Sequence, residues 1–300
     1  MRLAGLELGG TKCIAVLGDG LAISERREFP TTTPVETLAA ALAVLREWDG
    51  AAPLAAIGVA SFGPVRVDRA AADFGRILAT PKPGWSGTDV FGALRDAFAC
   101  PLALDTDVNG AVLAEYRLGA GQGCSSLVYL TIGTGVGGGI ALDGRAVHGA
   151  LHPELGHMLL RRAVGDTFAG ICPFHGDCIE GLICGPALAA RFGGDIHATP
   201  AGDPRRDFLA ADLAQLFAAL ILAVSPQKIL VGGGVGLGVP GLLDAAIAKV
   251  PAILNGYLPE LDVGALREII GPPRLGADAG PLGAVALAQS IAGNRHPPQG

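Results

Sequence analysis

The chain of 300 residues has few of the features that mark nucleic-acid-binding, membrane or secreted proteins. Its net charge is −6 and it has no large basic block, so nucleic acid is not an expected partner. No run approaches the ~18 uninterrupted apolar residues of a membrane-spanning helix, and the N-terminus has no apolar stretch of signal length. Six cysteines in a chain this long are not a disulfide framework. We therefore expect a soluble, cytoplasmic protein with reduced thiols and no membrane partner.

Hydrophobic residues make up 50% of the chain, and it has 46 glycines, which is typical of an α/β enzyme. One theme occurs twice, about 120 residues apart. Residues 3–8 and 12–17 are apolar runs joined by a Gly-Gly-Thr turn, and residues 126–144 again read as strand, glycine turn, strand. Glycine turns let backbone N–H groups approach an anion. The repeat predicts a duplicated domain with a cleft in which both turns bind a polyphosphate; the alternative is two ordinary hairpins.

The remaining periodicity predicts a helix over about 35–48 that begins near Thr33 or Pro34, and a buried strand within 53–65. Residues 87–98 are predicted as a helix with Thr88 as its N-cap. Residues 101–119 are predicted as strand, polar turn and helix, and the stretch from 228 as strand, glycine loop and helix. The tail 293–300 is expected to be disordered.

Two familiar nucleotide-binding motifs, the P-loop and G-x-G-x-x-G, were compared with the sequence. "GLELGGTK" is not a P-loop, because its last two residues are in the wrong order. "GTGVGG" and "GLGVPG" both match G-x-G-x-x-G, but a strand, not a helix, follows the first. The second precedes a helix and is suited to hold an adenosine or a phosphate. These matches leave a nicotinamide-dependent oxidoreductase as an alternative function.

Several motifs in order give a family resemblance over about residues 3–290. They are "GLELGGTK", "SFGPV", "TPKPGWSGTD", "DTDVNGAVLAE", "LTIGTGVGGGI", "HPELGH", "CPFHGDCIEGL" and "ILVGGGV". With them the chain resembles a ROK-family sugar kinase of the fructokinase branch. The resemblance implies an α/β, actin-like (ribonuclease H-like) two-domain kinase fold. It also implies transfer of the γ-phosphate of ATP, with Mg²⁺, to a hexose hydroxyl.

The resemblance also implies roles for individual residues. Asp107 would be the catalytic base, although as the start of a polar turn it could equally be an N-cap for a helix that begins near Asn109 or Gly110, as could Asp105. The sugar-binding residues would be Glu154, His157, Glu180 and Asn109, with a solvated surface acid as the alternative for Glu154. The ATP- and phosphate-binding residues would be Gly9, Gly10, Thr11, Lys12, Gly133, Thr134, Gly135, Gly232, Gly233 and Gly234.

Three departures from the family pattern bear on the substrate. Thr106 stands where glucokinase-like members have Asn, and the fructokinase branch tolerates it, so fructose is expected ahead of glucose or mannose. Glu7 stands where many relatives have Asp, and a longer carboxylate can still hold a Mg²⁺-bound water. Pro81 replaces another Asn, which makes Trp85 a structural residue. Because the chain has only four lysines, Lys12 and Lys82 are noticeable near these motifs.

The stretch "CPFHGDC" raises the question of a metal. Cys172, His175 and Cys178 are either three ligands of a catalytic zinc with an open position or a loop that holds thiols. His157 offers a fourth ligand, and a Cys2His2 set is typical of structural zinc. The family resemblance favours structural zinc (Zn²⁺), with His157 meeting the metal and the sugar through different nitrogens. The other cysteines, Cys13, Cys100, Cys124 and Cys184, are expected to be buried free thiols.

We predict a small domain over 1–118 with the first hairpin and Asp107. A large domain over 119–292 would carry the second hairpin, the metal loop and the nucleotide loop, with its last helix free to pack back on the small domain. The resemblance implies a homodimer. Some family members are DNA-binding sugar sensors, but a phosphate turn at residue 9 leaves no room before it for a DNA-binding domain.

Overall fold

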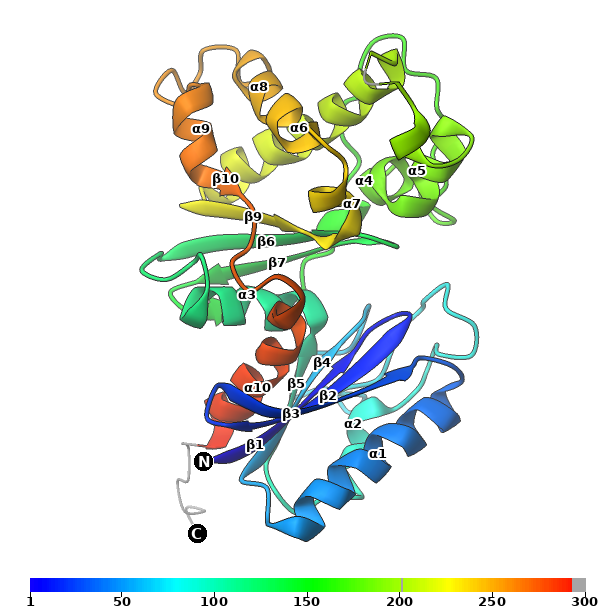
Figure 1. Cartoon of the computed structure of the whole chain (residues 1–300), viewed down its shortest axis with the longest axis vertical. Coiled ribbons are helices and arrows are strands. Elements are labelled where there is room, and N and C mark those ends of the chain that lie inside the picture. Colours follow the sequence, from blue (N-terminus) through cyan, green and yellow to red (C-terminus); the bar gives the residue numbers. More distant parts are fainter. Residues whose placement is uncertain (201, 293–300) are drawn as a thin grey trace. The chain divides into compact units, whose positions relative to one another are not determined.

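The computed structural model describes residues 1–200 and 202–292, so the tail 293–300 lies outside the described residues. The chain forms two compact units (Figure 1). The first unit comprises Met1–Leu118, Ala146–His152 and the chain from Leu275 onward, and the second comprises Gly119–Arg145 and Pro153–Arg274. The predicted boundary after residue 118 thus coincides with the end of the first stretch. Two later segments, 146–152 and 275–292, also belong to the first unit because they pack on its sheet and its helix termini.

The sheet of the first unit has the strand order β3-β2-β1-β4-β5. Its strands are β1 (Arg2–Leu8), β2 (Lys12–Asp19), β3 (Ala22–Pro30), β4 (Ala56–Ser61) and β5 (Leu102–Thr106). β1 and β2 pair antiparallel with Leu8 opposite Cys13, while β1, β4 and β5 run parallel. The first predicted hairpin is therefore confirmed, and β3 extends it by a strand that the sequence pattern did not reveal.

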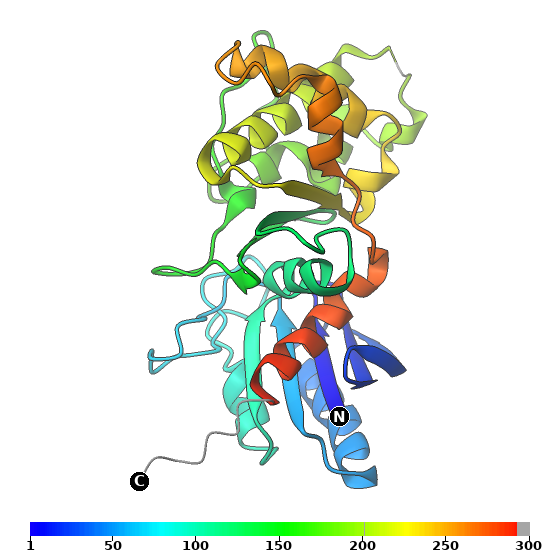
Figure 2. The ribbon, with the colours of Figure 1, turned by 90° about the vertical axis from the view of Figure 1, so that its left-hand side faces the viewer.

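Two helical layers cover the two faces of this sheet (Figures 1 and 2). Its helices are α1 (Pro34–Ala51), α2 (Val90–Arg95), α3 (Asp107–Leu118) and α10 (Ala279–Ala292), with a 3-10 turn η3 (Gly276–Asp278). On one face Leu6 and Leu8 pack with Trp48 of α1. On the other face Leu3 packs with Val285 of α10. The alternation of side chains along β1 thus feeds two separate cores.

Capping side chains set where these helices begin. Thr33 caps α1 in a reciprocal capping box with Glu36, which confirms the predicted start. α2 is capped by Asp89, whose Oδ1 accepts the Gly92 N–H at 2.7 Å, so the prediction of Thr88 was wrong.

α3 begins at Asp107, earlier than the predicted start near Asn109 or Gly110. The Thr106 hydroxyl accepts the Asn109 N–H at 3.1 Å, and so Thr106 is the N-cap. The alternative in which Asp107 or Asp105 serves as the cap is therefore wrong. The Asp107 carboxylate stands at the first helical position instead, at the carboxyl end of β5.

The sheet of the second unit repeats the plan of the first. Its order is β10-β9-β6-β7-β8. The strands are β6 (Ser126–Ile132), β7 (Val136–Leu142), β8 (Arg145–Ala146), β9 (Lys228–Gly232) and β10 (Ile270–Gly271). β6 and β7 form the antiparallel hairpin, and β9 and then β10 follow in parallel. The same order in both sheets confirms the predicted duplication.

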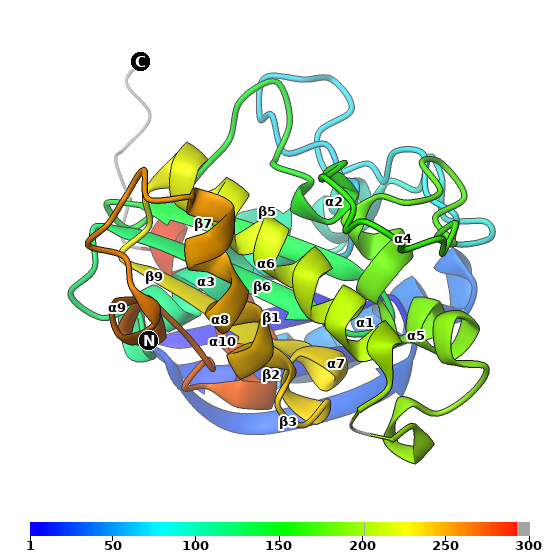
Figure 3. The ribbon, with the colours of Figure 1, turned by 90° about the horizontal axis from the view of Figure 1, so that it is seen from above.

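Helices lie over this second sheet, as the view from above shows (Figure 3). They are η1 (Leu155–His157), α4 (Ile179–Ile183), α5 (Gly185–Phe192), η2 (Ile196–Ala198), α6 (Pro204–Val224), α7 (Gly233–Gly238), α8 (Leu242–Leu254) and α9 (Val263–Ile269). The predicted glycine loop after β9 is the short helix α7 instead. Pro240 lies just before Gly241, the N-cap of α8, and not within its first turn.

α6 is long and apolar enough to pass for a membrane-spanning helix by length and composition. It packs against α4 and α8 inside the unit. Its Asp212 is 2% exposed and forms an ion pair with Arg191 of α5 at 2.9 Å. A buried, paired carboxylate and neighbours on several sides make α6 the core helix of this unit.

We predict that Gly58→Ala destabilises the first unit. A Cβ at Gly58 of β4 would lie 2.0 Å from the Ala284 carbonyl oxygen of α10, so the helix has to move away from the sheet. Overpacking of this kind costs about 1–3 kcal/mol of unfolding free energy. Gly50→Ala in α1 is the control, because nothing lies within 4 Å of its Cβ position and it should stabilise by up to about 1 kcal/mol. Urea unfolding of both variants measures the difference, and equal stability would contradict the close packing of α10.

Candidate functional site

In the turn of the first hairpin, carbonyls accept hydrogen bonds from the protein while two N–H groups stay free among the described residues. The Gly9 N–H bonds back across the turn to the Lys12 carbonyl at 3.1 Å. Thr31 donates two hydrogen bonds to carbonyls of the turn. Its hydroxyl donates to the Gly9 carbonyl at 2.7 Å, and its backbone N–H donates to the Thr11 carbonyl at 2.9 Å. Within the described part of the chain, the N–H groups of Gly10 and Thr11 donate to no other group. Two free N–H groups beside occupied carbonyls suit the binding of an anion.

The turn of the second hairpin has the same arrangement. The Gly133 N–H bonds to the Gly135 carbonyl at 2.9 Å, and the Gly133 carbonyl accepts the Gly185 N–H of α5 at 2.7 Å. For the residues that the structure describes, the N–H groups of Thr134 and Gly135 have no acceptor. The next amide is occupied, because Val136 donates to Glu180 at 3.0 Å.

The predicted nucleotide glycines lie beside this second turn. Gly232 ends β9, and Gly233 and Gly234 begin α7. The Cβ position of Gly233 is 2.4 Å from the Ile132 carbonyl oxygen, so the start of α7 abuts the end of β6. The structure therefore brings the residues 133–135 and 232–234 together within one unit.

Two carboxylates of the first unit lie near one another in a partly buried environment. Burial raises the pKa of Asp107 to about 6, opposed by the N–H groups of Val108 and of Asp107 itself. Burial, and then the charge of Asp107, raise the pKa of Glu7 to about 7. Glu7 lies against Gly280 in the first turn of α10, where the helix terminus favours negative charge. Its Oε2 atom is buried and has no hydrogen-bond partner among the described residues.

A second cluster lies at the junction of β5 and α3. Asp105 accepts hydrogen bonds from Thr106 N–H and from the Asn109 amide, each at 2.8 Å. His148 places its Nε2 atom 2.9 Å from the other oxygen of Asp105. The Asn109 side chain is 1% exposed, and its Oδ1 atom has no partner within the described chain. No local spacing predicted His148, because 43 residues separate it from Asp105.

Val136 of β7 contacts two of the segments that carry predicted sugar-binding residues. Its N–H donates to the carboxylate of Glu180 on α4. Its carbonyl oxygen lies 1.8 Å from the Cβ position of Gly156, so only glycine lets the η1 turn approach β7 this closely. Glu154 and His157 flank this glycine, Glu154 being exposed and His157 half-buried. The E-x-G-H motif is thus held directly against the second hairpin.

The four predicted metal ligands come together. His157, Cys172, His175 and Cys178 present ligand atoms that all lie within 4.8 Å of one another. The His157 Nδ1 atom is 3.8 Å from the Cys172 sulfur and 3.6 Å from the Cys178 sulfur, and the His175 Nδ1 atom is 3.8 Å from Cys172. Zinc–sulfur and zinc–nitrogen bonds of about 2.3 and 2.0 Å give tetrahedral sulfur–nitrogen edges of about 3.6 Å. The cluster therefore has the dimensions of a tetrahedral metal site.

A buried ion-pair network orders the chain between these ligands. Asp166 contacts both Arg162, at 2.6 Å, and Arg191, at 2.5 Å, and Arg191 continues to Asp212 at 2.9 Å. Arg162 also contacts Asp177, next to Cys178, at 3.1 Å. Sequence reasoning missed this network, because isolated charges in a loop are usually solvated. It ties the loop 162–177 to α5 and α6 independently of a metal.

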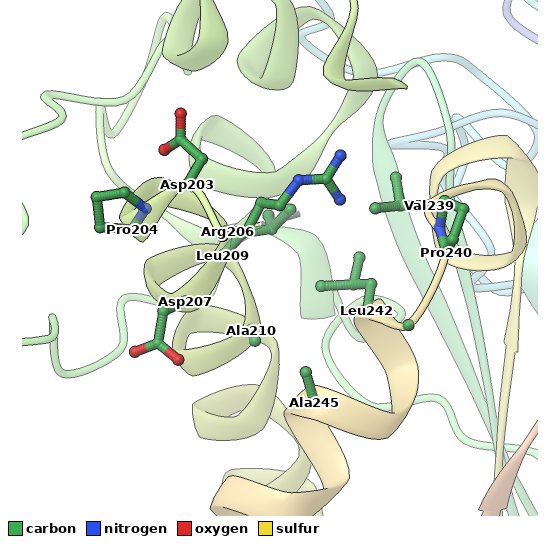
Figure 4. A pocket seen from close by; sticks show the side chains of 12 residues that line it. Asp203, Pro204, Arg206, Asp207, Leu209, Ala210, Val239, Pro240, Leu242 and Ala245 are labelled. Atoms are coloured by element: carbon green, nitrogen blue, oxygen red, sulfur yellow. The ribbon is translucent and has the colours of Figure 1, made fainter. Parts of the chain in front are cut away.

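The second unit also contains a cavity of about 430 Å³ between the first turns of α6 and α8 (Figure 4). Its walls carry Leu209 and Ala210 of α6, and Val239, Leu242 and Ala245 from the other side. Arg206 extends across it in Figure 4; its guanidinium donates to the carbonyls of Ile196 and Thr199. Asp203 and Asp207 also line the cavity, so it is apolar on one side and charged on the other. It lies close to the second G-x-G-x-x-G match and has the size of a small-molecule site.

Two sheets of one strand order, each beginning with an antiparallel hairpin, define the actin-like class of kinase folds. The chain belongs to the ROK family, whose sequence model matches residues 3–291. It is 41% identical over 292 residues to the fructokinase of Zymomonas mobilis, covering 94% of this chain and 95% of that protein. It is 39% identical over 295 residues to the fructokinase of Pediococcus pentosaceus, covering 98% and 100%. The ROK hexokinase structure from Thermus thermophilus aligns with a TM-score of 0.77 at 30% identity, covering 96% of this chain and 98% of that one.

We predict that Glu7→Gln stabilises the protein at alkaline pH. Because the folded-state pKa of Glu7 is raised, the wild type loses unfolding free energy as pH rises through about 7, and glutamine avoids this loss. The gain at pH 8.5 should be about 1–3 kcal/mol and should vanish near pH 4. Glu47→Gln, at an exposed position of α1, is the control without a pH-dependent effect. Urea unfolding without Mg²⁺ tests this, and a variant less stable than wild type at pH 8.5 would refute it.

Proposed function

We propose that this ROK-family protein is an ATP-dependent hexose kinase whose preferred acceptor is the 6-hydroxyl of D-fructose. The kinase activity rests on Asp107, a carboxylate at the end of β5 whose pKa of about 6 leaves it ionised at neutral pH. The choice of fructose rests on the full-length similarity to proteins named fructokinase. As the family resemblance implies, the protein is cytoplasmic and dimeric in this proposal.

In the proposed reaction the 6-hydroxyl oxygen attacks the γ-phosphorus while the bond to the β–γ bridging oxygen breaks and ADP leaves. Asp107 accepts the hydroxyl proton, which is why it has to be ionised beforehand. The free N–H groups of Gly10, Thr11, Thr134 and Gly135 bind phosphate oxygens. Mg²⁺ bound with ATP would neutralise phosphate charge, and the unpaired Oε2 atom of Glu7 fits a contact with a metal-bound water.

The sugar-binding proposal uses one histidine, one amide and two carboxylates. His157 turns Nδ1 toward the two cysteines, so its Nε2 atom can meet a sugar hydroxyl. Asn109 has an unused, buried acceptor in Oδ1. Glu154 is exposed, and Glu180 is fixed at the second hairpin through one oxygen. These four residues are proposed as the hydroxyl-binding set.

The metal in this proposal is structural zinc, bound by His157, Cys172, His175 and Cys178. Four protein ligands fill a tetrahedron and leave no position for substrate. When bound, zinc would supply no chemistry to the transfer but would fix the tautomer and the ring orientation of His157. Because Cys178 is the residue before α4, the ligand set also supports the start of the helix that carries Glu180.

The adenosine of ATP is proposed to occupy the cavity between α6 and α8. The cavity follows directly on α7, which begins at the predicted nucleotide glycines. Leu209, Val239 and Leu242 offer apolar surface to a flat heterocycle, and Arg206 supplies a planar cation over which a base can stack.

A coupled ADP-release assay with fructose, mannose and glucose tests the proposed function. We expect kcat/KM for fructose to exceed that for glucose by at least about tenfold, or 1.4 kcal/mol of transition-state discrimination. The reverse ratio would place the protein among glucokinases, the alternative that Thr106 argues against. The kinase proposal would be overturned if none of the hexoses in the panel caused ADP release. Sugar-dependent reduction of a nicotinamide cofactor would also overturn it.

We predict that Asp107→Asn keeps the fold and lowers kcat by about 10²–10⁴-fold, because an amide cannot accept the proton. In the wild type, kcat/KM should fall below about pH 6, as Asp107 becomes protonated. The exposed Asp96→Asn serves as control and should keep the wild-type rate and profile. Steady-state kinetics between pH 5 and 8 decide this, and a near-normal kcat for Asp107→Asn would refute the assignment.

We predict that Cys172→Ser loses about one equivalent of zinc and raises the fructose KM by about tenfold, with a smaller effect on the ATP KM. The half-buried Cys124→Ser is the matched control, with zinc content and KM unchanged. Elemental analysis and kinetics measure both. Hydrogen exchange should rise near 171–178 but stay low at 162–168, where the ion pairs remain. A wild-type protein purified without chelators and lacking zinc would refute the metal assignment.

We predict that Ala245→Phe, which fills the cavity, raises the ATP KM by at least about tenfold and leaves the fructose KM within twofold, a ratio equal to about 1.4 kcal/mol. Ala248→Phe is the control, because it is exposed on the same helix but does not line the cavity. Unchanged ATP KM in Ala245→Phe would place the adenosine elsewhere.

A further inference from the structure

Lys82 is held over the first phosphate turn by a preorganised loop. Trp85, three residues on, is fully buried, donates its ring N–H to the Thr32 carbonyl at 3.0 Å and packs edge-on against Phe62. This confirms Trp85 as a structural residue. The backbone N–H of Trp85 also donates to the Lys82 carbonyl at 3.3 Å. The backbone of Lys82 is thus fixed from the core side.

The ammonium group of Lys82 reaches the turn itself. Its Nζ atom donates to the Gly10 carbonyl, the residue whose N–H group is free. The Cβ position of Gly10 has no atom within 4 Å, so the turn is open to a ligand at this point. A lysine ammonium has three N–H donors, and one carbonyl uses only one of them.

The other lysine of this hairpin is committed elsewhere. Lys12 forms an ion pair with Glu28 at 3.0 Å, and both side chains are about half exposed. In contrast, Lys82 is partly buried and pairs with no carboxylate within the described part of the chain. Of the two cations near the turn, Lys82 is the one whose charge is not already neutralised.

Satisfying a carbonyl does not by itself account for Lys82. Gly10 is exposed, so water can serve its carbonyl oxygen at no cost. Because the Lys82 ammonium pairs with no carboxylate among the described residues, its charge is available to an anion at the turn. The position of Lys82, above free N–H groups and beside an open turn, is what a phosphoryl group requires.

We infer that Lys82 is a further catalytic residue, which contacts a non-bridging oxygen of the phosphoryl group as it passes from ATP to the sugar. The inference rests on the proposed kinase function. Lys82 forms and breaks no bond; the sugar oxygen bonds to phosphorus, ADP leaves with the bridging oxygen, and the proton goes to Asp107. The fixed ammonium compensates charge on the moving group at no reorganisation cost.

The test first establishes the wild-type rate with fructose and ATP, and then compares Lys82→Met, Lys82→Arg and the matched control Lys228→Met. Lys228 also donates its Nζ to a backbone carbonyl, that of Glu268, but has no place in the proposed site. We expect Lys82→Met to lower kcat by about 10²-fold, the usual effect of removing one donor to transition-state charge. The fructose KM should stay within threefold. Lys82→Arg should regain about tenfold, and Lys228→Met should stay within threefold of wild type. Thermal unfolding checks that each variant is folded.

Binding measurements then separate a catalytic from a structural role. In the presence of fructose and Mg²⁺, Lys82→Met should bind ADP with aluminium fluoride at least about 30-fold more weakly, while its affinity for ADP alone is unchanged. Equal losses for both ligands, or a raised fructose KM with normal kcat, would overturn the inference. An inactive wild type would instead contradict the proposed function, so the two failures are distinct.

Discussion

Both units are built around a hairpin turn in which backbone carbonyls are hydrogen-bonded while two N–H groups donate to nothing among the described residues. In the first turn Thr31, directly after β3, donates to the carbonyls of Gly9 and Thr11. In the second, an α5 N–H binds the carbonyl of Gly133. A turn left to itself presents both kinds of group and repels as much as it attracts. Removing the acceptors is what makes an uncharged backbone selective for anions.

In the second unit the Cys2His2 cluster is connected with the hairpin turn through α4. Cys178 precedes α4, α4 carries Glu180, and Glu180 accepts the N–H of Val136. On the other side of Val136, Gly156 lets the turn with His157 pack against the same residue. The segments that carry His157 and Cys178 thus pack against the carbonyl and the N–H of Val136. The ion pair of Arg162 and Asp166 holds the chain between these segments. The support is shared, so neither component orders the region alone.

Local patterns made much of this predictable. The hairpins, and Cys172, His175 and Cys178, depend on residues a few positions apart, so their spacing carries the information. His157 lies 15 positions before Cys172, and it was the family resemblance that favoured structural zinc bound by all four residues. The contacts of His148 with Asp105, and of Lys82 with Gly10, join residues 43 and 72 positions apart, and no spacing encodes them. α6 was missed because a helix buried on most sides has no polar face. The ion pair of Arg191 and Asp212 was missed because pairing in a core depends on tertiary structure.

The packing of α10 on β1 and β4 sets the order in which the protein can mature on the ribosome. The first sheet is made early, yet its Gly58 face is covered by residues 279–292, the last described helix. While the second unit is being translated, α10 has not yet been made, so that face of the sheet is not covered. The nascent chain therefore carries an open apolar surface through most of synthesis. Chaperones can therefore bind this surface until α10 has been made and has packed on the sheet.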